Sequence, residues 1–398
     1  MKTDASLIIW TQGIRAYGYG FTAILLGHLL ASKGAPPLRV GLLLTCIVLG
    51  SALSSLVLMR YGDIWGRRRS YGWIYLLLGV VGFAVAIFPN PIILGILSLT
   101  GVLSTDANDN GPATTLEQAM LSGRRPSSHM PKIFGRYNGV AAIFGAFGAL
   151  TQGLLSHFSW FESSFVGFLI LVPIGFAGWV ISRRLTSDVE SRLAVDGKRE
   201  RRTLKHSSAR KRILDLSLLF SVDAAAGGLV TSSFLSYYLT TRYHVSASFL
   251  GYLFFAFAFL QSLSMFIAPW VARHLGLVWT MVSTHLVSNA CLISAALCGN
   301  FLLATVFLLL RASLSQMDIP TRQALIIAAV PEEDRMAASA VTNAARYAIR
   351  PVAPFAGAAL QQIAMATPLV LSGTMKVAYD FGILAWAKRE GYLSRTID

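Results

Sequence analysis

The sequence predicts an all-α membrane protein in which 12 transmembrane helices form two pseudo-symmetric six-helix bundles. Of its 398 residues, 54% are hydrophobic and only 13% are charged, whereas an ordinary globular chain carries about 25% charged residues. The mean hydropathy is +0.58. A soluble protein of this size could not cover its surface with so few charges, so soluble enzymes and nucleic-acid-binding domains are disfavoured from the outset.

Apolar segments of the length that a bilayer requires, roughly 20 residues, recur twelve times along the chain. They cover residues 6–31, 40–60, 71–88, 92–121, 134–156, 160–182, 213–240, 247–272, 277–297, 300–328, 337–365 and 368–387. The fourth, tenth and eleventh segments are the least regular, because each carries several charged residues. The polar stretch 183–212 follows the sixth segment, and we interpret it as a cytoplasmic basic linker between an N-terminal bundle (1–182) and a C-terminal bundle (213–398).

The positive charges predict the orientation of the chain. The formal net charge is +15, from 34 Lys and Arg against 19 Asp and Glu. If both termini are cytoplasmic, the inside segments hold 25 of these basic residues and the outside loops hold three. Cytoplasmic loops carry such an excess, so the charge indicates a multi-pass protein of the inner (plasma) membrane rather than a partner of nucleic acid. The N-terminus lacks a basic region and a small-residue cleavage site, so we expect no cleaved signal peptide.

The two predicted bundles resemble each other weakly, as an internal repeat should. Residues 109–112 (Asp-Asn-Gly-Pro) in the fourth segment match residues 317–320 (Met-Asp-Ile-Pro) in the tenth, and Asn138 in the fifth matches Asn343 in the eleventh. Because several matches occur in the same order, a duplicated six-helix unit is the favoured interpretation.

The most specific motif stands at the end of the second segment, where Asp63-Ile-Trp-Gly66-Arg67-Arg-Arg occurs. It resembles the loop signature of the major facilitator superfamily, G-x-x-x-D-x-x-G-R-[RK]-[RK], although Met59 occupies the position of the first glycine. The six-plus-six layout, the central linker and the orientation fit the same family, and the stretch 315–323 resembles poorly characterised prokaryotic members. The resemblance implies a secondary active transporter that moves a small solute by alternating access.

The motif predicts a cytoplasmic gate. Asp63 can meet the positive end of a neighbouring helix or a basic residue, Gly66 permits a tight turn, and Arg67 can pair with acidic groups. In the superfamily this loop steadies the outward-facing state, and the resemblance implies the same role here. We assign Glu117 to this gate as well, because it should lie near the inner surface.

Charged residues inside apolar segments are the candidates for a solvated path, because each costs at least about 2.5–3.5 kcal/mol on insertion scales. The family resemblance implies that the first, fourth, seventh and tenth segments line a central cavity. These segments hold the charged residues Arg15, Asp106, Asp109, Asp223, Arg311, Asp318 and Arg322. The predicted substrate and proton path further includes Asn108, Asn110, Asn138, Asn343 and Arg346.

Several pairings are predicted from spacing. Asp106 and Asp109 are three residues apart and would share a helix face, where each raises the pKa of the other unless an arginine such as Arg15 neutralises them. Asp318 and Arg322 are four apart and could form an intrahelical pair. Lys376 and Asp380 would neutralise each other in the same way.

Further predictions concern the packing and shape of the helices. Arg15 and Asp223 hold repeat-equivalent places and should both face the central cavity. Pro351 and Pro354 should bend the eleventh segment. The small residues of the fifth segment, Gly139-x₅-Gly145-x₂-Gly148, fit close helix packing better than a proline-containing antiporter signature.

Coupling to an ion gradient is expected, because no Gly-x-x-x-x-Gly-Lys-Ser/Thr loop for ATP is present. Protons are the favoured ion and Asp109 the favoured carrier, with sodium as the alternative. The arginines favour an organic anion as substrate, whereas the acidic groups would favour a cation. His28 and His285 lie in spans and are either packing residues or proton sites.

Other classes of function stay open as alternatives. They are a drug or metabolite efflux antiporter, a transporter-derived sensor or scaffold, and a membrane-embedded enzyme. An enzyme would need a nucleophile–base or metal constellation, and the sequence has neither. We expect no cofactor, no metal and no nucleic-acid partner; the expected partners are a small solute, protons and the lipid bilayer, and the chain is expected to be a monomer.

Overall fold

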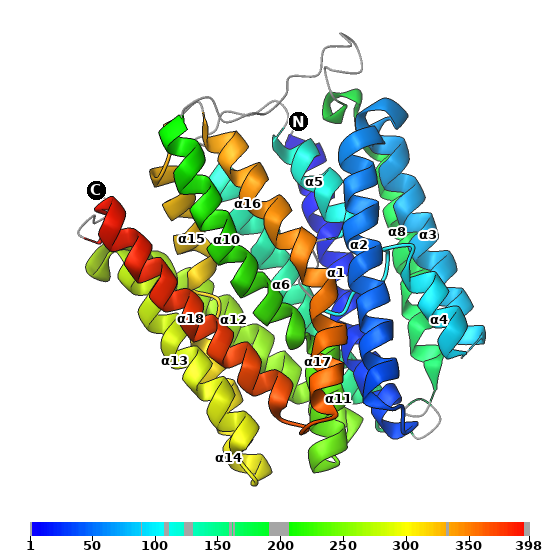
Figure 1. The fold of residues 1–398 in the computed structure, drawn as a ribbon. Coiled ribbons are helices and arrows are strands. Elements are labelled where there is room, and N and C mark those ends of the chain that lie inside the picture. The colour runs from blue at the N-terminus through cyan, green and yellow to red at the C-terminus, as the bar shows by residue number, and fades with distance from the viewer. Residues whose placement is uncertain are drawn as a thin grey trace. The chain divides into compact units, whose positions relative to one another are not determined.

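The computed structural model describes residues 2–88, 90–106, 111–122, 130–158, 161, 164–190, 207–331 and 334–393, and every regular element within these ranges is a helix (Figure 1). The chain divides into two compact units. Unit 1 comprises Met1–Arg199 and Thr231–Ala256, and unit 2 comprises Glu200–Val230 and Phe257–Asp398. Unit 1 thus includes Thr231–Ala256, a segment that the sequence assigned to the C-terminal bundle.

Unit 1 contains α1 (Lys2–Ser32), α2 (Pro37–Trp65), α3 (Arg67–Ile87), α4 (Pro91–Ser98), α5 (Pro112–Ser122), α6 (Met130–Leu155), η2 (Phe165–Ile170), α8 (Leu171–Arg184), η3 (Ser187–Val189), α11 (Ser232–Tyr243) and the beginning of α12 (Ala247–Leu275). Unit 2 contains α10 (Ser207–Leu229), the rest of α12, α13 (Leu277–Leu297), α14 (Phe301–Leu314), α15 (Asp318–Ala328), α16 (Arg335–Ile349), η5 (Arg350–Val352), α17 (Ala353–Gln361) and α18 (Thr367–Glu390).

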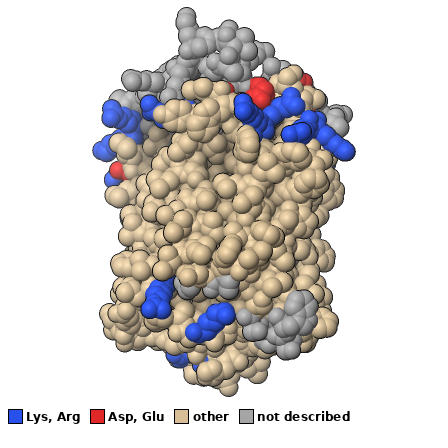
Figure 2. All heavy atoms as spheres, turned by 90° about the vertical axis from the view of Figure 1, so that its right-hand side faces the viewer, with Lys and Arg blue, Asp and Glu red and all other residues tan. Residues whose placement is uncertain are grey.

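The helices have the length and composition of membrane spans. Seven helical segments of the described chain are long and apolar enough to cross a bilayer, and an eighth is added if α10 and α11 count as one broken span. Large apolar side chains such as Phe83, Ile92 and Phe176 are 51%, 73% and 62% exposed. On the face shown in Figure 2, Lys and Arg gather toward the two ends and leave a wide uncharged band between them. Such a band fits the hydrocarbon core of a bilayer.

Close packing of small residues brings α1 against α6. A Cβ atom on Gly20 would overlap the carbonyl oxygen of Gly145, and one on Gly148 would overlap that of Tyr17. Backbones approach this closely only where both helices carry small residues. The interpretation of Gly145 and Gly148 as packing residues is confirmed.

Four predicted spans are interrupted. The fourth leaves its helix after Ser98, where Gly101 adopts φ 78°, and resumes at Pro112. The tenth breaks between Leu314 and Asp318, and the eleventh passes through the 3₁₀ turn η5, as the prolines of that segment predict. The seventh, predicted as a span over 213–240, consists of the two helices α10 and α11.

The break in the seventh span has a local cause. The pair Gly227-Gly228 lies in the last turn of α10, and glycine is among the weakest helix formers. The side chain of Thr231 then caps a new helix by accepting a hydrogen bond from the backbone N–H of Phe234 at 3.2 Å. Two shorter helices therefore replace one long helix.

Candidate functional site

A buried ion pair lies inside unit 1. The Arg15 guanidinium on α1 donates from Nη1 to Oε1 of Glu117 at 2.7 Å and from Nη2 to Oε2 at 2.9 Å. Their side chains are 1% and 0% exposed. A two-pronged pair of this kind is geometrically specific, and its burial makes each partner depend on the other.

Three tyrosines complete the coordination of the Glu117 carboxylate. Tyr71 and Tyr137 each donate a hydrogen bond of 2.6 Å, and Tyr75 donates a longer one of 3.3 Å. On the other side, Arg15 also donates to Thr114 at 2.8 Å and to Gln12. We call Arg15, Tyr71, Tyr75, Glu117 and Tyr137 the unit 1 cluster. Because its charges are paired and hydrogen-bonded, the cluster offsets the desolvation penalty of burying them.

Asp106 does not belong to the unit 1 cluster and instead binds the start of α11. It lies in non-helical chain between α4 and α5, and its Oδ1 accepts a hydrogen bond from the backbone N–H of Ser232 at 2.8 Å. The carbonyl of Thr105 accepts a further bond from the N–H of Ser233 at 3.1 Å. Asp106 therefore binds the positive N-terminus of α11. The expectation that Asp106 shares a helix face with Asp109 was wrong for Asp106, because the chain is not helical there.

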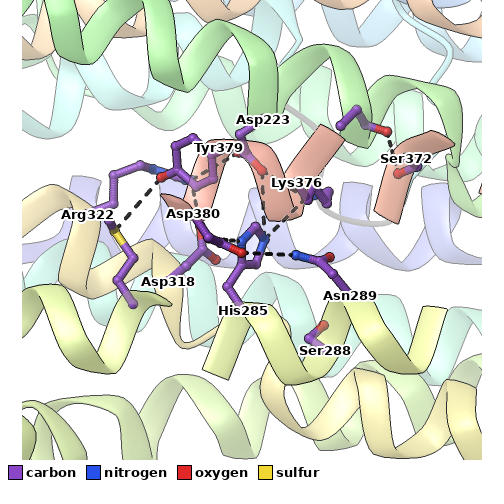
Figure 3. A network of polar contacts seen from close by, with 12 residues as sticks. Asp223, His285, Ser288, Asn289, Asp318, Arg322, Ser372, Lys376, Tyr379 and Asp380 are labelled. Carbon is purple, nitrogen blue, oxygen red and sulfur yellow. Dashed lines mark hydrogen bonds and ion pairs between the residues drawn. The ribbon is translucent and has the colours of Figure 1, made fainter. Parts of the chain in front are cut away.

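A second group of charges lies inside unit 2 (Figure 3). The carboxylate of Asp223 on α10 is central: its Oδ1 lies 2.8 Å from Nζ of Lys376, and its Oδ2 lies 3.3 Å from Arg322 and 3.6 Å from Arg346. Arg322 also pairs with Asp318 at 2.6 Å, one turn away on α15. The predicted intrahelical pair is thus confirmed, and it extends into a network.

A histidine joins this network to another carboxylate. Nδ1 of His285 on α13 lies 2.8 Å from Oδ1 of Asp380 on α18, and its Nε2 lies 3.4 Å from Nζ of Lys376 and 3.8 Å from Oδ1 of Asp223. Asn289 donates to the other oxygen of Asp380 at 3.4 Å. The prediction that Lys376 and Asp380 pair with each other was wrong, because Lys376 binds Asp223 and Asp380 binds His285. The unit 2 cluster comprises Asp223, His285, Asp318, Arg322, Arg346, Lys376 and Asp380.

The Asp63 motif forms the corner between α2 and α3. Gly66 adopts φ 85° there, and Arg67 binds Asp63 at 2.6 Å and the carbonyl of Ala119 at 3.1 Å. Glu190 accepts hydrogen bonds from the backbone N–H groups of Arg67 and Arg68 at 2.7 and 3.2 Å. It thereby supplies a negative charge at the N-terminus of α3.

The structure groups the predicted residues differently from the sequence. Glu117 was predicted to belong to the cytoplasmic gate with Asp63, but its carboxylate forms an ion pair with Arg15. Asn138 and Asn343 are both exposed, next to the buried residues Tyr137 and Thr342. Asn108, Asp109 and Asn110 lie outside the described residues.

Arg311 stands apart from both clusters. It is partly buried at the end of α14, and its Nε has no hydrogen-bond partner in the described part of the chain. No carboxylate among the described residues pairs with its guanidinium. Arg311 is therefore a cation whose charge is not neutralised by a neighbour within those ranges.

Sequence reasoning missed several members of these clusters. Lys376, Asp380, Glu190 and the three tyrosines were not predicted as site residues, and His285 was predicted only as either a packing residue or a proton site. A signal existed for His285, Lys376 and Asp380, since each is an ionisable residue within an apolar segment. For the tyrosines no pattern in the sequence points to a buried carboxylate.

Apolar helices of spanning length that enclose buried ionisable residues define a multi-pass membrane protein. The family model for the Major Facilitator Superfamily matches residues 8–354. The chain belongs to this superfamily and is a membrane transporter, not an enzyme.

Known proteins resemble the chain over almost its whole length. An uncharacterized membrane protein of Saccharomyces cerevisiae is 24% identical over 419 residues, covering 95% of this chain and 92% of that protein. Among solved structures, the D-xylose–proton symporter matches with a TM-score of 0.72 and 12% identity, covering 95% of this chain and 96% of that one. The nucleoside transporter NupG gives 0.69 and 11%, covering 98% and 99%. A bacterial homolog of the human lysosomal transporter Spinster gives 0.67 and 13%, covering 100% and 98%. At these identities the structures establish the fold alone.

Proposed function

We propose that this transporter moves a small solute across the inner (plasma) membrane by alternating access and couples that movement to protons. The observation that carries the proposal is the unit 2 cluster, which encloses the titratable pair His285–Asp380 among helices of spanning character. Ionisable residues at such depth commonly serve proton relays. The excess of Lys and Arg in alternate loops supports cytoplasmic termini.

An organic anion is the substrate class we propose. Arg15 contributes no free charge to an anion site, because Glu117 neutralises it. Arg346 is 28% exposed and lies at 3.6 Å from Asp223, and Arg311 has no carboxylate partner among the described residues. These two arginines are the cations best able to attract an anionic solute in unit 2.

Counterflow in proteoliposomes tests the proposal. The purified chain is first screened by thermal shift against organic anions, amino acids, sugars and cationic drugs, since a bound solute stabilises the folded state by mass action. The stabilising solute is then loaded into the vesicles at high concentration, and its exchange with labelled external solute is measured. In vesicles without internal solute, net uptake is measured together with a pH-sensitive dye, because one-for-one exchange moves no net protons even in a coupled transporter. We expect exchange, and we expect net uptake to be accompanied by proton movement. Net uptake without proton movement would refute the coupling, and absence of exchange would favour a sensor or scaffold.

The same measurement separates symport from antiport. Protons that move with the solute indicate a symporter. Protons that move against it indicate the alternative, an efflux antiporter for drugs or metabolites.

A further inference from the structure

His285 lies between a carboxylate and an ammonium group, and this placement constrains where its proton sits. Its Nδ1 is 2.8 Å from Asp380, whose side chain is 0% exposed. Nδ1 must carry a hydrogen here, because Asp380 as a carboxylate only accepts. In the neutral imidazole the lone pair then belongs to Nε2, which faces Nζ of Lys376 at 3.4 Å. The side-chain network therefore fits a neutral His285 that accepts from Lys376.

The charges of the unit 2 cluster balance in this state. Three cations, Arg322, Arg346 and Lys376, face three carboxylates, Asp223, Asp318 and Asp380. Three groups contact the imidazole or its partners directly: Asp223 on α10 lies near its Nε2, and Lys376 and Asp380 on α18 lie on its two nitrogens. Tyr379 on α18 packs against the ring, and Asn289 on α13 binds Asp380. The remaining charges of the cluster act through Asp223: Arg322 on α15, with its partner Asp318, and Arg346 on α16. A proton added to Nε2 would give the cluster a net charge of +1.

That added proton would meet a specific conflict. It would place a positively charged N–H 3.4 Å from the ammonium of Lys376, which is unfavourable, and 3.8 Å from Oδ1 of Asp223, which is favourable. Lys376 already occupies Oδ1 at 2.8 Å. The imidazolium and Lys376 thus compete for one carboxylate oxygen, as Figure 3 shows from the positions of the three side chains.

Lys376 is the partner that can move. Its side chain is 13% exposed, whereas those of His285 and Asp380 are 3% and 0% exposed. A long flexible ammonium side chain can change its rotamer, while the imidazole is held by Asp380 and packs nearly perpendicular to the Tyr379 ring, with 5.7 Å between the ring centroids. Protonation would therefore shift Lys376 rather than His285.

We propose that His285, held by Asp380, is a proton-binding site in unit 2, and that its proton displaces Lys376 from Asp223. The role of this site in coupling rests on the proposed function, whereas proton binding itself does not. The competition links a proton on His285 of α13 to the salt bridge between Asp223 of α10 and Lys376 of α18. A bound proton would therefore break a salt bridge that joins these two helices.

The test is a histidine titration of the full chain in detergent micelles. The protein is labelled with ¹³C and ¹⁵N in histidine, and the imidazole signals are followed by NMR from pH 4.5 to 9. The His285 signal is assigned as the one that disappears in His285→Gln. His28→Gln serves as the matched control, because His28 is a buried histidine of unit 1 near Thr240, and its loss should leave the His285 signal unchanged.

Two variants give opposite expected shifts. Asp380→Asn removes the carboxylate that favours the imidazolium, so the midpoint of the His285 titration should fall by about one pH unit or more, which is a tenfold change in proton affinity. Lys376→Gln removes the competing ammonium, so the midpoint should rise by a similar amount. A histidine that stays neutral throughout this range would respond to neither variant.

A His285 signal that does not titrate in this range, or a midpoint that Lys376→Gln leaves unchanged, would overturn the proposal. If the proposed function were wrong, counterflow would be absent while the His285 titration would still occur, so the two failures are distinguishable.

Discussion

Arg15 in unit 1 and Asp223 in unit 2 carry opposite charges, and each binds a partner on the second half of an interrupted span. Arg15 on α1 binds Glu117 on α5, whereas Asp223 on α10 binds Arg322 on α15. In each unit the ion pair thus joins the first helix to the second half of the fourth span, with the positions of the positive and negative groups exchanged. The two units therefore share this kind of connection, with opposite polarity.

Glu117→Gln is expected to destabilise the protein by about 3–5 kcal/mol, because it leaves the buried Arg15 guanidinium without its counter-charge. Thermal or denaturant unfolding of the purified protein measures the effect. The double variant Arg15→Met with Glu117→Leu should recover only part of the loss, because it removes both buried charges but leaves the hydroxyls of Tyr71, Tyr75 and Tyr137 without the carboxylate that they donate to. A double variant no more stable than Glu117→Gln would contradict this account, and would reopen the possibility that Asp109 is the partner of Arg15.

Asp63→Asn is expected to impair transport while leaving membrane insertion and stability nearly normal. Asp63 is 37% exposed and binds Arg67 at 2.6 Å, and exposed ion pairs contribute only about 0–1 kcal/mol. Exchange of an identified substrate in proteoliposomes measures the effect, with Asp188→Asn on the exposed turn η3 as the control. Transport by Asp63→Asn at the wild-type rate would contradict the assignment of Asp63 to the cytoplasmic gate.

If Asp109, the carrier that the sequence predicts, binds the coupled proton instead of His285, Asp109→Asn should abolish accumulation driven by a proton gradient but preserve substrate exchange. The reason is that exchange needs only binding and alternating access, whereas accumulation needs the carrier to bind and release a proton. Comparing the two rates for Asp109→Asn and for His285→Gln assigns the coupling site. Unchanged accumulation in Asp109→Asn would exclude it as the carrier.

Gly148→Val is expected to disrupt the packing of α1 on α6, because even a Cβ atom there would overlap the carbonyl oxygen of Tyr17. Overpacking of this kind costs at least about 1–3 kcal/mol. Gly135→Ala on the same helix is the matched control, since nothing lies within 4 Å of the position that its methyl group would take. Gly135→Ala should stabilise by about 0.5–1 kcal/mol through helix propensity. Equal melting temperatures for the two variants would contradict the close approach of these helices.

The sequence was informative about features that lie within one helix. Apolar length predicted the spans, prolines predicted the interruption at η5, and the four-residue spacing predicted the pair Asp318–Arg322. These features depend on residues that are close together in the sequence, so local sequence patterns can predict them.

Long-range pairs could not be predicted in this way. Arg15 and Glu117 are 102 residues apart, and His285 and Asp380 are 95 apart. Their contact depends on the rotation of whole helices about their axes, which packing decides. Local spacing instead suggested the wrong partner for Lys376. The carboxylate of Asp380 is bound by His285 and Asn289, and Lys376 binds Asp223 on another helix.

Glu190 has a consequence for how the chain could be divided. Its carboxylate comes from beyond α8 yet holds the backbone N–H groups at the start of α3. Two co-expressed fragments cut after residue 190 would leave this anion on the same polypeptide as the corner that it binds. A cut before it would transfer the anion to the other fragment, and α3 would then begin with two unpartnered N–H groups until the fragments met.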